Sequence, residues 1–172
     1  PISQLPNVEH NEQLFPLLFL YRKELPDSGG AGEYRGGLSI SKTMLCTGDV
    51  MISQVTNKHI RTSWGLKDGK PSISGATLYQ AKGANDWQTI KEAFGKVSSS
   101  KYSNVPIHPG ERISVKAPGG GGFGSPAKRD HAAIVEDVLE GYISREKAAE
   151  DYGFEESWIA QYAPEDAAAA AE

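Results

Sequence analysis

A run of four glycines, Gly119–Gly122, stands between Pro118 and Pro126 and constrains this chain more than any other feature of its sequence. Glycine loses more conformational freedom than any other residue when a chain becomes ordered, so an ordered run of four is costly. Such a run needs a structural reason, either positive φ angles or very close packing against another backbone. The flanking prolines restrict the segment further. We therefore expect residues 118–126 to form one fixed loop, buried against a partner chain or against the larger half of the same fold.

The same cluster, extended to Gly124, matches the spacing G-x-G-x-x-G of dinucleotide-binding loops. Its surroundings argue against that function. A proline follows at position 126 and the next helix is expected only from Asp130, so no helix N-terminus points at a phosphate. The Gly-Lys-Ser/Thr ending of a P-loop is also missing. A tight crossing of backbones, where side chains would clash, explains the glycines better.

A second stretch rich in turn residues, 26–37, carries Asp27, Ser28 and Arg35 among its glycines. The side chains of Asp27 and Ser28 can accept hydrogen bonds from nearby backbone N–H groups and so stabilise a turn. Arg35 can pair with a carboxylate. The residues that we expect to be structural or to face a partner are Asp27, Ser28, Gly29, Gly30, Gly32, Arg35, Gly36, Gly37, Pro118, Gly119, Gly120, Gly121, Gly122, Phe123, Gly124 and Pro126.

Most of the first 129 residues predict short strands separated by turns. Residues 17–23 form a short run whose length favours a buried strand. Residues 17–21 are apolar on both faces and, without elements to cover them, would leave a docking or aggregation surface. We expect the segments 38–45 and 50–57 to form a hairpin through residues 46–49. The other predicted elements are strands at 76–81 and 113–116, a short helix at 87–94 and an irregular segment at 1–12.

The pattern becomes helical after residue 129. Asp130 is a suitable N-cap for a helix that runs to Glu140, and Ser144 can cap a second helix that Gly153 ends in the left-handed conformation. Strands followed by a helical pair predict an α+β fold with mainly antiparallel sheet. The predicted single domain has three parts, namely a β-rich body at 1–129, a helical pair at 130–156 and an acidic, alanine-rich tail at 157–172.

Charge is unevenly distributed along the chain. The formal net charge is −4, yet residues 130–172 contain twelve acidic and only two basic residues. A small net charge gives no general attraction to nucleic acid, and basic residues are not interleaved with aromatic residues along one face. The acidic end is interpreted either as a solvated tail or as a segment that docks on a basic surface of a partner.

Side chains that commonly carry catalysis or bind metals are sparse. The single cysteine, Cys46, permits no internal disulfide and fits a small buried hydrophobe in a reducing compartment. No two histidines have the i, i+3 or i, i+4 spacing of a helical metal site. The absence of a signal peptide and of an apolar run of membrane-spanning length predicts a cytoplasmic protein. We expect no catalytic, cofactor-binding or metal-binding residue in this chain.

Three stretches together resemble the C-terminal part of the hydantoinase B family. The first joins FPLLFLYR at 15–22 to LPDSGGAG and YRGG at 25–37. The second is APGGGGFGSP at 117–126, and the third ends in AAEDYG at 148–153. Their order and spacing agree with the family over about residues 5–155. The resemblance implies that the chain forms part of a larger hydantoinase B-like fold.

The resemblance also implies an activity at the level of a complex. Family members hydrolyse cyclic amides such as N-methylhydantoin and 5-oxoproline with ATP, and related members carboxylate acetone or acetophenone. The run at 16–22 is more similar to the carboxylase branch. We therefore expect a subunit of an ATP-dependent ligase, a carboxylase that joins bicarbonate to a ketone such as acetophenone. The alternatives are a subunit of a cyclic-amide hydrolase of the hydantoinase or oxoprolinase type, and a purely structural interaction subunit.

Partners follow from the same resemblance. Family members are several times longer, so we expect a separately encoded C-terminal piece that works with a hydantoinase B-like large subunit. ATP and Mg²⁺ are expected in hydantoinase A-like partner subunits and not in this chain. Catalytic residues of the family lie in its N-terminal portion, so none is carried over. Ala117 replaces a usual threonine, Phe123 a tyrosine and Ser125 an acidic residue, so polar contacts at these positions are not carried over either.

Overall fold

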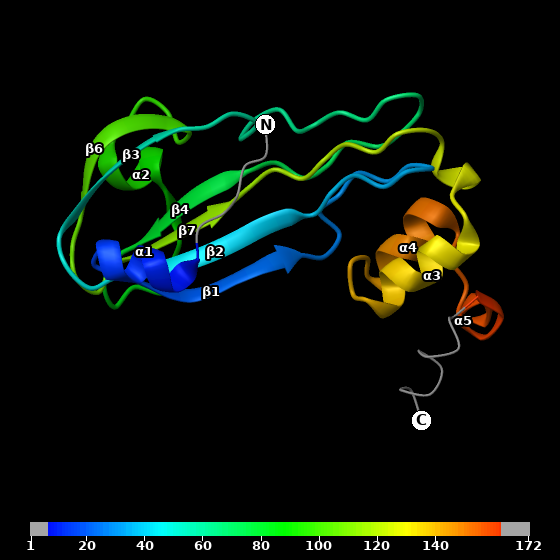
Figure 1. Cartoon of the computed structure of the whole chain (residues 1–172). Helices are drawn as coiled ribbons and strands as arrows, with labels where there is room; N and C mark the ends of the chain where they lie inside the picture. Colours follow the sequence, from blue (N-terminus) through cyan, green and yellow to red (C-terminus); the bar gives the residue numbers. More distant parts are fainter. Residues whose placement is uncertain (1–6, 163–172) are drawn as a thin grey trace. The chain divides into compact units, whose positions relative to one another are not determined.

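The computed structural model describes residues 7–162, in which strands are followed by a group of helices (Figure 1). Five strands form one sheet in the order β1-β2-β7-β4-β5, and β3 pairs with β6 in a second sheet. The pairs β2–β7, β4–β7, β4–β5 and β3–β6 are all antiparallel. This architecture confirms the predicted α+β class. The elements are α1 (Val8–Leu14), β1 (Leu17–Leu25), β2 (Ser39–Cys46), β3 (Val50–Val55), β4 (Ala76–Gln80), β5 (Gln88–Thr89), α2 (Ile90–Phe94), β6 (Lys101–Ile107), β7 (Arg112–Lys116), the 3-10 turn η1 (Pro126–Lys128), α3 (His131–Leu139), α4 (Arg145–Tyr152) and α5 (Ser157–Tyr162).

Contacts divide the chain into two compact units. The first unit comprises residues 1–23, 41–59 and 75–117, and the second comprises residues 24–40, 60–74 and 118–172. Each unit is therefore assembled from three separate stretches of chain. The division at residues 129 and 156 that the sequence suggests remains a prediction.

The first unit has a core made of side chains. Its strand β7 pairs with β2 on one side and with β4 on the other, which places Met44 and Tyr79 on either side of Ile113 (Figure 1). Side chains from α2 and β6 complete the same cluster. Its buried members are Met44, Cys46, Tyr79, Ile90, Tyr102, Val105, Ile107 and Ile113.

Cys46 is buried at the end of β2, as the sequence predicts. Burial raises the pKa of its thiol to about 11, and the nearby Glu111 carboxylate adds to this effect. The thiol therefore stays protonated at neutral pH, which is the state that reacts poorly as a nucleophile.

The second unit contains the helices α3, α4 and α5 (yellow to red in Figure 1). The Asp130 side chain accepts a hydrogen bond from the backbone N–H of Ala132 and caps α3, and Ser144 caps α4 in the same way. Gly153 has a φ of 71° and ends α4. These caps confirm the two predicted helices. The buried side chains of their small core are Ile134, Val135, Val138, Ile143, Ala148 and Phe154.

The predicted hairpin between 38–45 and 50–57 is wrong. β2 lies between β1 and β7, whereas β3 pairs with β6 in the other sheet. The turn at 46–49 carries the chain from one sheet to the other. Alternating residues identify a strand but not its partner, and here Val50 pairs with Ile107, 57 positions later.

The strand predicted at 17–23 is present as β1, but it is not buried on both faces. Leu18, Leu20 and Tyr21 are each between 41% and 44% exposed. The reason is that β1 lies at the edge of its sheet, where only Leu17 and Phe19 pack against the core. Position in the sheet decides this burial, and the local sequence does not contain that information.

Helix α1 and strand β6 were not predicted, and neither was helix α5, which lies in the segment that was expected to be a tail. The first has only seven residues and its N-cap side chain makes no capping hydrogen bond, so it leaves little signal in the sequence. The second contains Pro106 and a residue with positive φ, Asn104, both of which weaken a strand pattern. Residues 87–94 form β5 and then α2, which begins with a capping box of Thr89 and Glu92. Residues 1–6 and 163–172, parts of the predicted irregular segment and tail, lie outside the described residues.

Candidate functional site

Three glycine-rich stretches of the second unit, residues 28–37, 63–72 and 118–124, pack against one another through their backbones. We call them the glycine layer. The N–H of Gly120 donates to the carbonyl of Gly37 (2.9 Å), and the N–H of Gly30 donates to the carbonyl of Gly120 (2.8 Å). Toward the stretch 63–72, the N–H of Gly122 donates to the carbonyl of Lys70 (3.0 Å). The run that the sequence singled out is thus held to both neighbouring stretches.

Close approach of backbones explains why these positions are glycines. A Cβ at Gly121 would overlap the carbonyl oxygen of Trp64, and a Cβ at Gly122 would overlap that of Ala31. Gly36 is equally restricted, because its Cβ would overlap the carbonyl oxygen of Gly120. None of these glycines has a positive φ, so close packing is the reason for the run. The same restriction applies to Gly29, Gly30, Gly32, Gly65, Gly69 and Gly119.

Two glycines of the layer differ from the others. Gly124 has a φ of 77°, so here the backbone conformation itself favours glycine. Gly37 has neither restriction, because no atom lies within 4 Å of the position its Cβ would take. Gly37 therefore provides a natural control position within the layer.

Ser28 and Asp27 connect the layer to segments far away in the sequence. The fully buried hydroxyl of Ser28 accepts from the N–H of Ser39 (2.7 Å) and donates to the carbonyl of Leu25. Asp27 has a φ of 61°, and its carboxylate accepts from the N–H of Ser144 (2.7 Å) at the start of α4. Both side chains bond backbone N–H groups, as expected of such residues, but the Asp27 partner is 117 positions away.

A cluster of three charged side chains joins the layer to α3. Arg35 donates two hydrogen bonds to the two carboxylate oxygens of Asp137, each of 3.0 Å. Arg129 donates to the Oδ2 atom of Asp137 (2.7 Å) and to the backbone carbonyl of Glu33 (3.2 Å). All three side chains are at most 16% exposed. Because the guanidinium groups occupy both oxygens of Asp137, this carboxylate holds the fold together and is not open to a substrate.

Two tyrosines complete this cluster. The Arg35 guanidinium lies 5.5 Å from the ring centre of Tyr142, and that of Arg129 lies 5.8 Å from the ring centre of Tyr152. The N–H of Gly32 donates to the Tyr152 hydroxyl (3.4 Å). Burial raises the pKa of Tyr152, so this hydroxyl stays protonated at neutral pH.

The sequence did not identify Asp137, Arg129 or Tyr152 as site residues. The sequence offered one signal for Asp137, because this residue stands beside the apolar residues of the α3 stripe. In the structure Asp137 is only 6% exposed. An acid on the buried side of a helix requires a cationic partner. That partner is Arg35, which was expected to pair with a carboxylate. The two residues are 102 positions apart, so the sequence did not indicate which carboxylate Arg35 binds.

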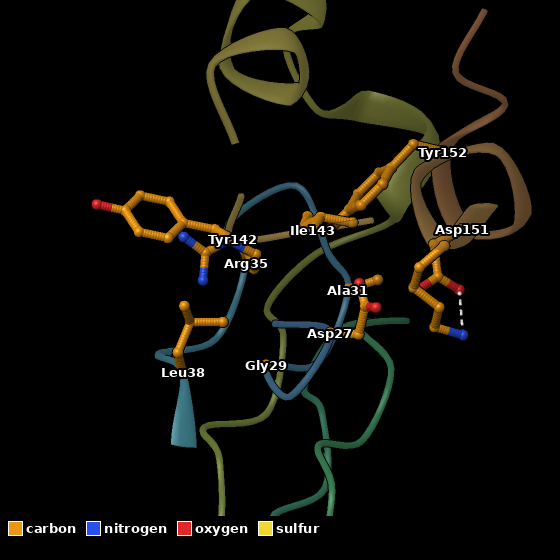
Figure 2. A pocket seen from close by; sticks show the side chains of 10 residues that line it. Asp27, Gly29, Ala31, Arg35, Leu38, Tyr142, Ile143, Asp151 and Tyr152 are labelled. Atoms are coloured by element: carbon orange, nitrogen blue, oxygen red, sulfur yellow. Dashed lines mark ion pairs between the residues drawn. The ribbon is translucent and has the colours of Figure 1, made fainter. Parts of the chain in front are cut away.

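A small cavity lies next to this cluster (Figure 2). Its volume of about 10 Å³ is enough for roughly one water molecule. Figure 2 shows Arg35 and Tyr142 on one side of the cavity and Asp151 on the other. The lining residues are Asp27, Gly29, Ala31, Arg35, Leu38, Tyr142, Ile143, Lys147, Asp151 and Tyr152.

A second, more open pocket of about 260 Å³ shares part of this lining and adds Lys70 and Ser72. Its charged groups pair with one another. Lys70 Nζ lies 2.7 Å from Asp151, and Lys147 Nζ lies 2.9 Å from Glu150 and 3.5 Å from Asp151. The Glu150 hydrogen bond is the main cause that raises the pKa of Lys147. Charges that neutralise each other in this way offer little attraction to a charged ligand.

Comparison with known proteins shows to which family this chain belongs. Residues 2–126 match the model of the family described as Hydantoinase B/oxoprolinase. The chain belongs to the hydantoinase B/oxoprolinase family. The glycine layer lies entirely within the matched residues, so it is a feature of the family region of this chain.

Relatives within the family are much longer. The chain is 34% identical over 145 residues to an uncharacterized protein of Methanocaldococcus jannaschii, covering 84% of this chain and 24% of that protein. It is 30% identical to the caprolactamase subunit beta of Pseudomonas jessenii (86% and 24% covered) and 26% identical to the acetone carboxylase alpha subunit of Xanthobacter autotrophicus (89% and 23% covered). The chain therefore spans about a quarter of the length of these relatives.

Two solved structures share the fold of this chain. A nucleotide-free acetone carboxylase has a TM-score of 0.68 at 23% identity and covers 88% of this chain and 23% of its own. An ATP-dependent caprolactamase from Pseudomonas jessenii has the same TM-score and identity, with 95% and 27% covered. The fold thus occurs as one part of larger proteins, as the family resemblance implied.

The histidines of this chain do not cluster with one another. His59 contacts Thr56 (3.0 Å), His108 contacts Asp49 (2.8 Å), and His131 stacks on Trp158 at a ring distance of 3.8 Å. Within residues 7–162, no group of three His, Cys, Asp or Glu side chains has the geometry to hold a metal ion. In the same part of the chain, no helix is long and apolar enough to cross a membrane.

Proposed function

We propose that this chain is a structural part of the hydantoinase B-type subunit of an ATP-dependent complex and contributes no reacting group. One observation carries the proposal: the charged side chains that join the glycine layer to α3, and those that line the open pocket, pair with one another. Both oxygens of Asp137 are taken by arginines, and the lysines beside the open pocket are paired with acids. The coverage of about a quarter of each relative supports the same role.

Carboxylation of a ketone is our first proposal for the activity of the whole complex. An ATP-dependent ligase would join bicarbonate to acetone or to an aromatic ketone such as acetophenone. The apolar run at 16–22, which resembles the carboxylase branch of the family, supports this version. We place ATP and Mg²⁺ in hydantoinase A-like partner subunits, with this chain next to them in the complex and free of nucleotide.

Hydrolysis of a cyclic amide is the second candidate, and a different observation favours it. The identity with the caprolactamase subunit, 30%, exceeds the 26% identity with the acetone carboxylase subunit. Both fold comparisons have the same TM-score, so the fold does not separate the two activities. Both candidates use ATP to activate a carbonyl compound, and they differ in whether bicarbonate or water is the second substrate.

Reconstitution of the complex tests the proposal and separates the two candidates. The chain is mixed with a hydantoinase B-like large chain and hydantoinase A-like subunits, with ATP, Mg²⁺ and labelled bicarbonate. We expect this chain to co-purify and to be required for ATP-dependent label incorporation with acetone or acetophenone. ATP-dependent ring opening of caprolactam, hydantoin or 5-oxoproline without incorporation would favour the hydrolase. Equal turnover with and without this chain would contradict the proposed function.

Calorimetry of the chain with ATP and Mg²⁺ tests where nucleotide binds. We expect no binding at micromolar ATP, because the backbone N–H groups of Gly120 and Gly122 already donate to carbonyl groups inside the glycine layer. A phosphate cradle requires such N–H groups to be free. Micromolar binding would contradict this assignment and would identify the glycine run as a phosphate-binding loop.

A further inference from the structure

Three large apolar side chains, Tyr34, Leu66 and Phe123, are exposed together on the glycine layer. Their exposed fractions are 65%, 57% and 41%. Each comes from a different one of the three stretches. We call this group the tip patch. Scattered single hydrophobic residues on a surface need no explanation, but a group assembled from three segments does.

Backbone pairing puts these three side chains on one face. Tyr34 and Phe123 form an antiparallel bridge, and Leu66 and Phe123 form a parallel one, so that Phe123 stands in the middle. Residues paired in this way point to the same side of a sheet. The rings of Tyr34 and Phe123 are 6.2 Å apart. The ammonium group of Lys67 lies 5.3 Å from the Phe123 ring centre and adds a cationic rim.

The platform beneath the tip patch is ordered in advance. Tyr34 and Phe123 exchange two backbone hydrogen bonds of 2.9 Å each. Leu66 is held in the same way, because its N–H donates to the carbonyl of Gly122 (2.9 Å) and its carbonyl accepts from the N–H of Gly124 (2.9 Å). Binding to a preordered surface loses less conformational entropy than binding to a mobile loop. Exposed aromatic side chains on a rigid support are typical of the residues that dominate interfaces.

We propose that the tip patch is a docking surface for the remaining part of the hydantoinase B-type subunit. The inference rests on the proposed function and adds to it the residues that make the contact. The choice of occupant follows from chain length, because the relatives carry about three quarters of their length outside the region that matches this chain. All three patch residues lie within residues 2–126, the region that the family model matches. An apolar surface in this region fits a partner whose own contact surface is apolar with a polar rim.

Affinity measurements with two variants test the proposal. Leu66→Asp and Tyr34→Ser change exposed side chains without touching the backbone bridges. We expect each variant to bind the large chain at least about tenfold more weakly than the parent. The melting temperature and circular dichroism of the free chain should not change. The control is Val97→Asp, which makes the same apolar-to-acidic change at an isolated residue that is 96% exposed in the first unit.

Cross-linking then identifies the occupant. A photoreactive phenylalanine derivative in place of Leu66 should link to the large chain in the assembled complex. Links to a hydantoinase A-like subunit or to a second copy of this chain would overturn the assignment. It would also be overturned if both variants bound the large chain like the parent, or if the Val97 control lost as much affinity. A parent chain that binds no large chain would instead contradict the proposed function on which this inference rests.

Discussion

The core of the first unit and the glycine layer of the second unit are stabilised in opposite ways. In the first unit, side chains from strands and a helix fill a common core, and residues such as Ile107 and Val105 are fully buried. In the glycine layer of the second unit, backbones contact one another directly, and a carbonyl oxygen stands where a Cβ would be at Gly121 or Gly122. A side-chain core can adjust rotamers when a residue changes. A layer of glycines has no rotamers, so it has far less freedom to accommodate an added atom.

Addition of carbon atoms to the glycine run should have the largest effect. Gly121→Val places a branched side chain against the Trp64 carbonyl, and we expect it to cost more than about 4 kcal/mol of folding free energy. Soluble yield and urea unfolding measure this loss. Gly121→Ala should cost less than the valine variant but much more than Gly37→Ala, the matched control with no atom within 4 Å of its Cβ position. Equal effects of the two alanine variants would show that the layer does not pack as described.

Removal of the central acid of the charged cluster should have the second largest effect. Asp137→Ala leaves the guanidinium groups of Arg35 and Arg129 buried without their partner, which costs about 3–5 kcal/mol in comparable cases. The control is Glu156→Ala, which breaks the exposed pair with Arg145 and should cost less than about 1 kcal/mol. Urea unfolding of both variants gives the two values. If the two losses were similar, the cluster would not be a major support of the second unit.

Loss of one carbon atom from the core of the first unit should have a smaller effect. Ile107→Val removes a single methylene from a fully buried side chain in β6, and such changes cost about 0.5–1.5 kcal/mol. This variant is compared with Gly121→Ala. The comparison gives the loss of folding free energy for one carbon atom removed from a side-chain core and for one carbon atom added to a backbone-packed layer. A loss in Ile107→Val that matched or exceeded the loss in Gly121→Ala would remove the distinction between the two units.

The smallest effect is expected from His108 in the first unit. Its hydrogen bond to Asp49 raises the pKa of His108 above its usual value of 6.5. A histidine with a raised folded-state pKa adds stability that is fully present below pH 6.5 and is lost as the pH rises through the raised pKa. We expect His108→Ala to remove this slight pH dependence, measured as melting temperature between pH 5 and about 8. A variant that keeps the full pH dependence of the parent would assign it to other groups.

Local signals in the sequence predicted the helices α3 and α4 of the second unit. Asp130 and Ser144 cap α3 and α4, and Gly153 ends α4, all within a few positions of the residues they act on. The unusual nature of the glycine run was also visible, because four ordered glycines require either positive φ angles or close packing. What the sequence did not contain was the identity of the neighbouring backbones. The carbonyl oxygens that exclude a Cβ at Gly121 and Gly122 belong to Trp64 and Ala31, more than 50 positions away.

Long-range pairing also accounts for the other differences. The hairpin of 38–45 with 50–57 was wrong because the turn between them connects two sheets. β2 lies between β1 and β7 in one sheet, whereas β3 pairs with β6 in the other. Arg35 was expected to pair with a carboxylate, but only the fold selects Asp137 for it. In each case the local pattern gave the kind of residue or element, while the partner was set by packing between distant segments.

Native-state hydrogen exchange of the glycine amides tests the central claim most directly. The amides of Gly30, Gly120 and Gly122 each donate to a carbonyl of a neighbouring stretch at 2.8–3.0 Å. We predict that they exchange as slowly as the paired amides of β7, because both groups require opening of packed structure before exchange. Exchange of these glycine amides at the rate of an unstructured chain would contradict the claim and would make the glycine run a flexible tether.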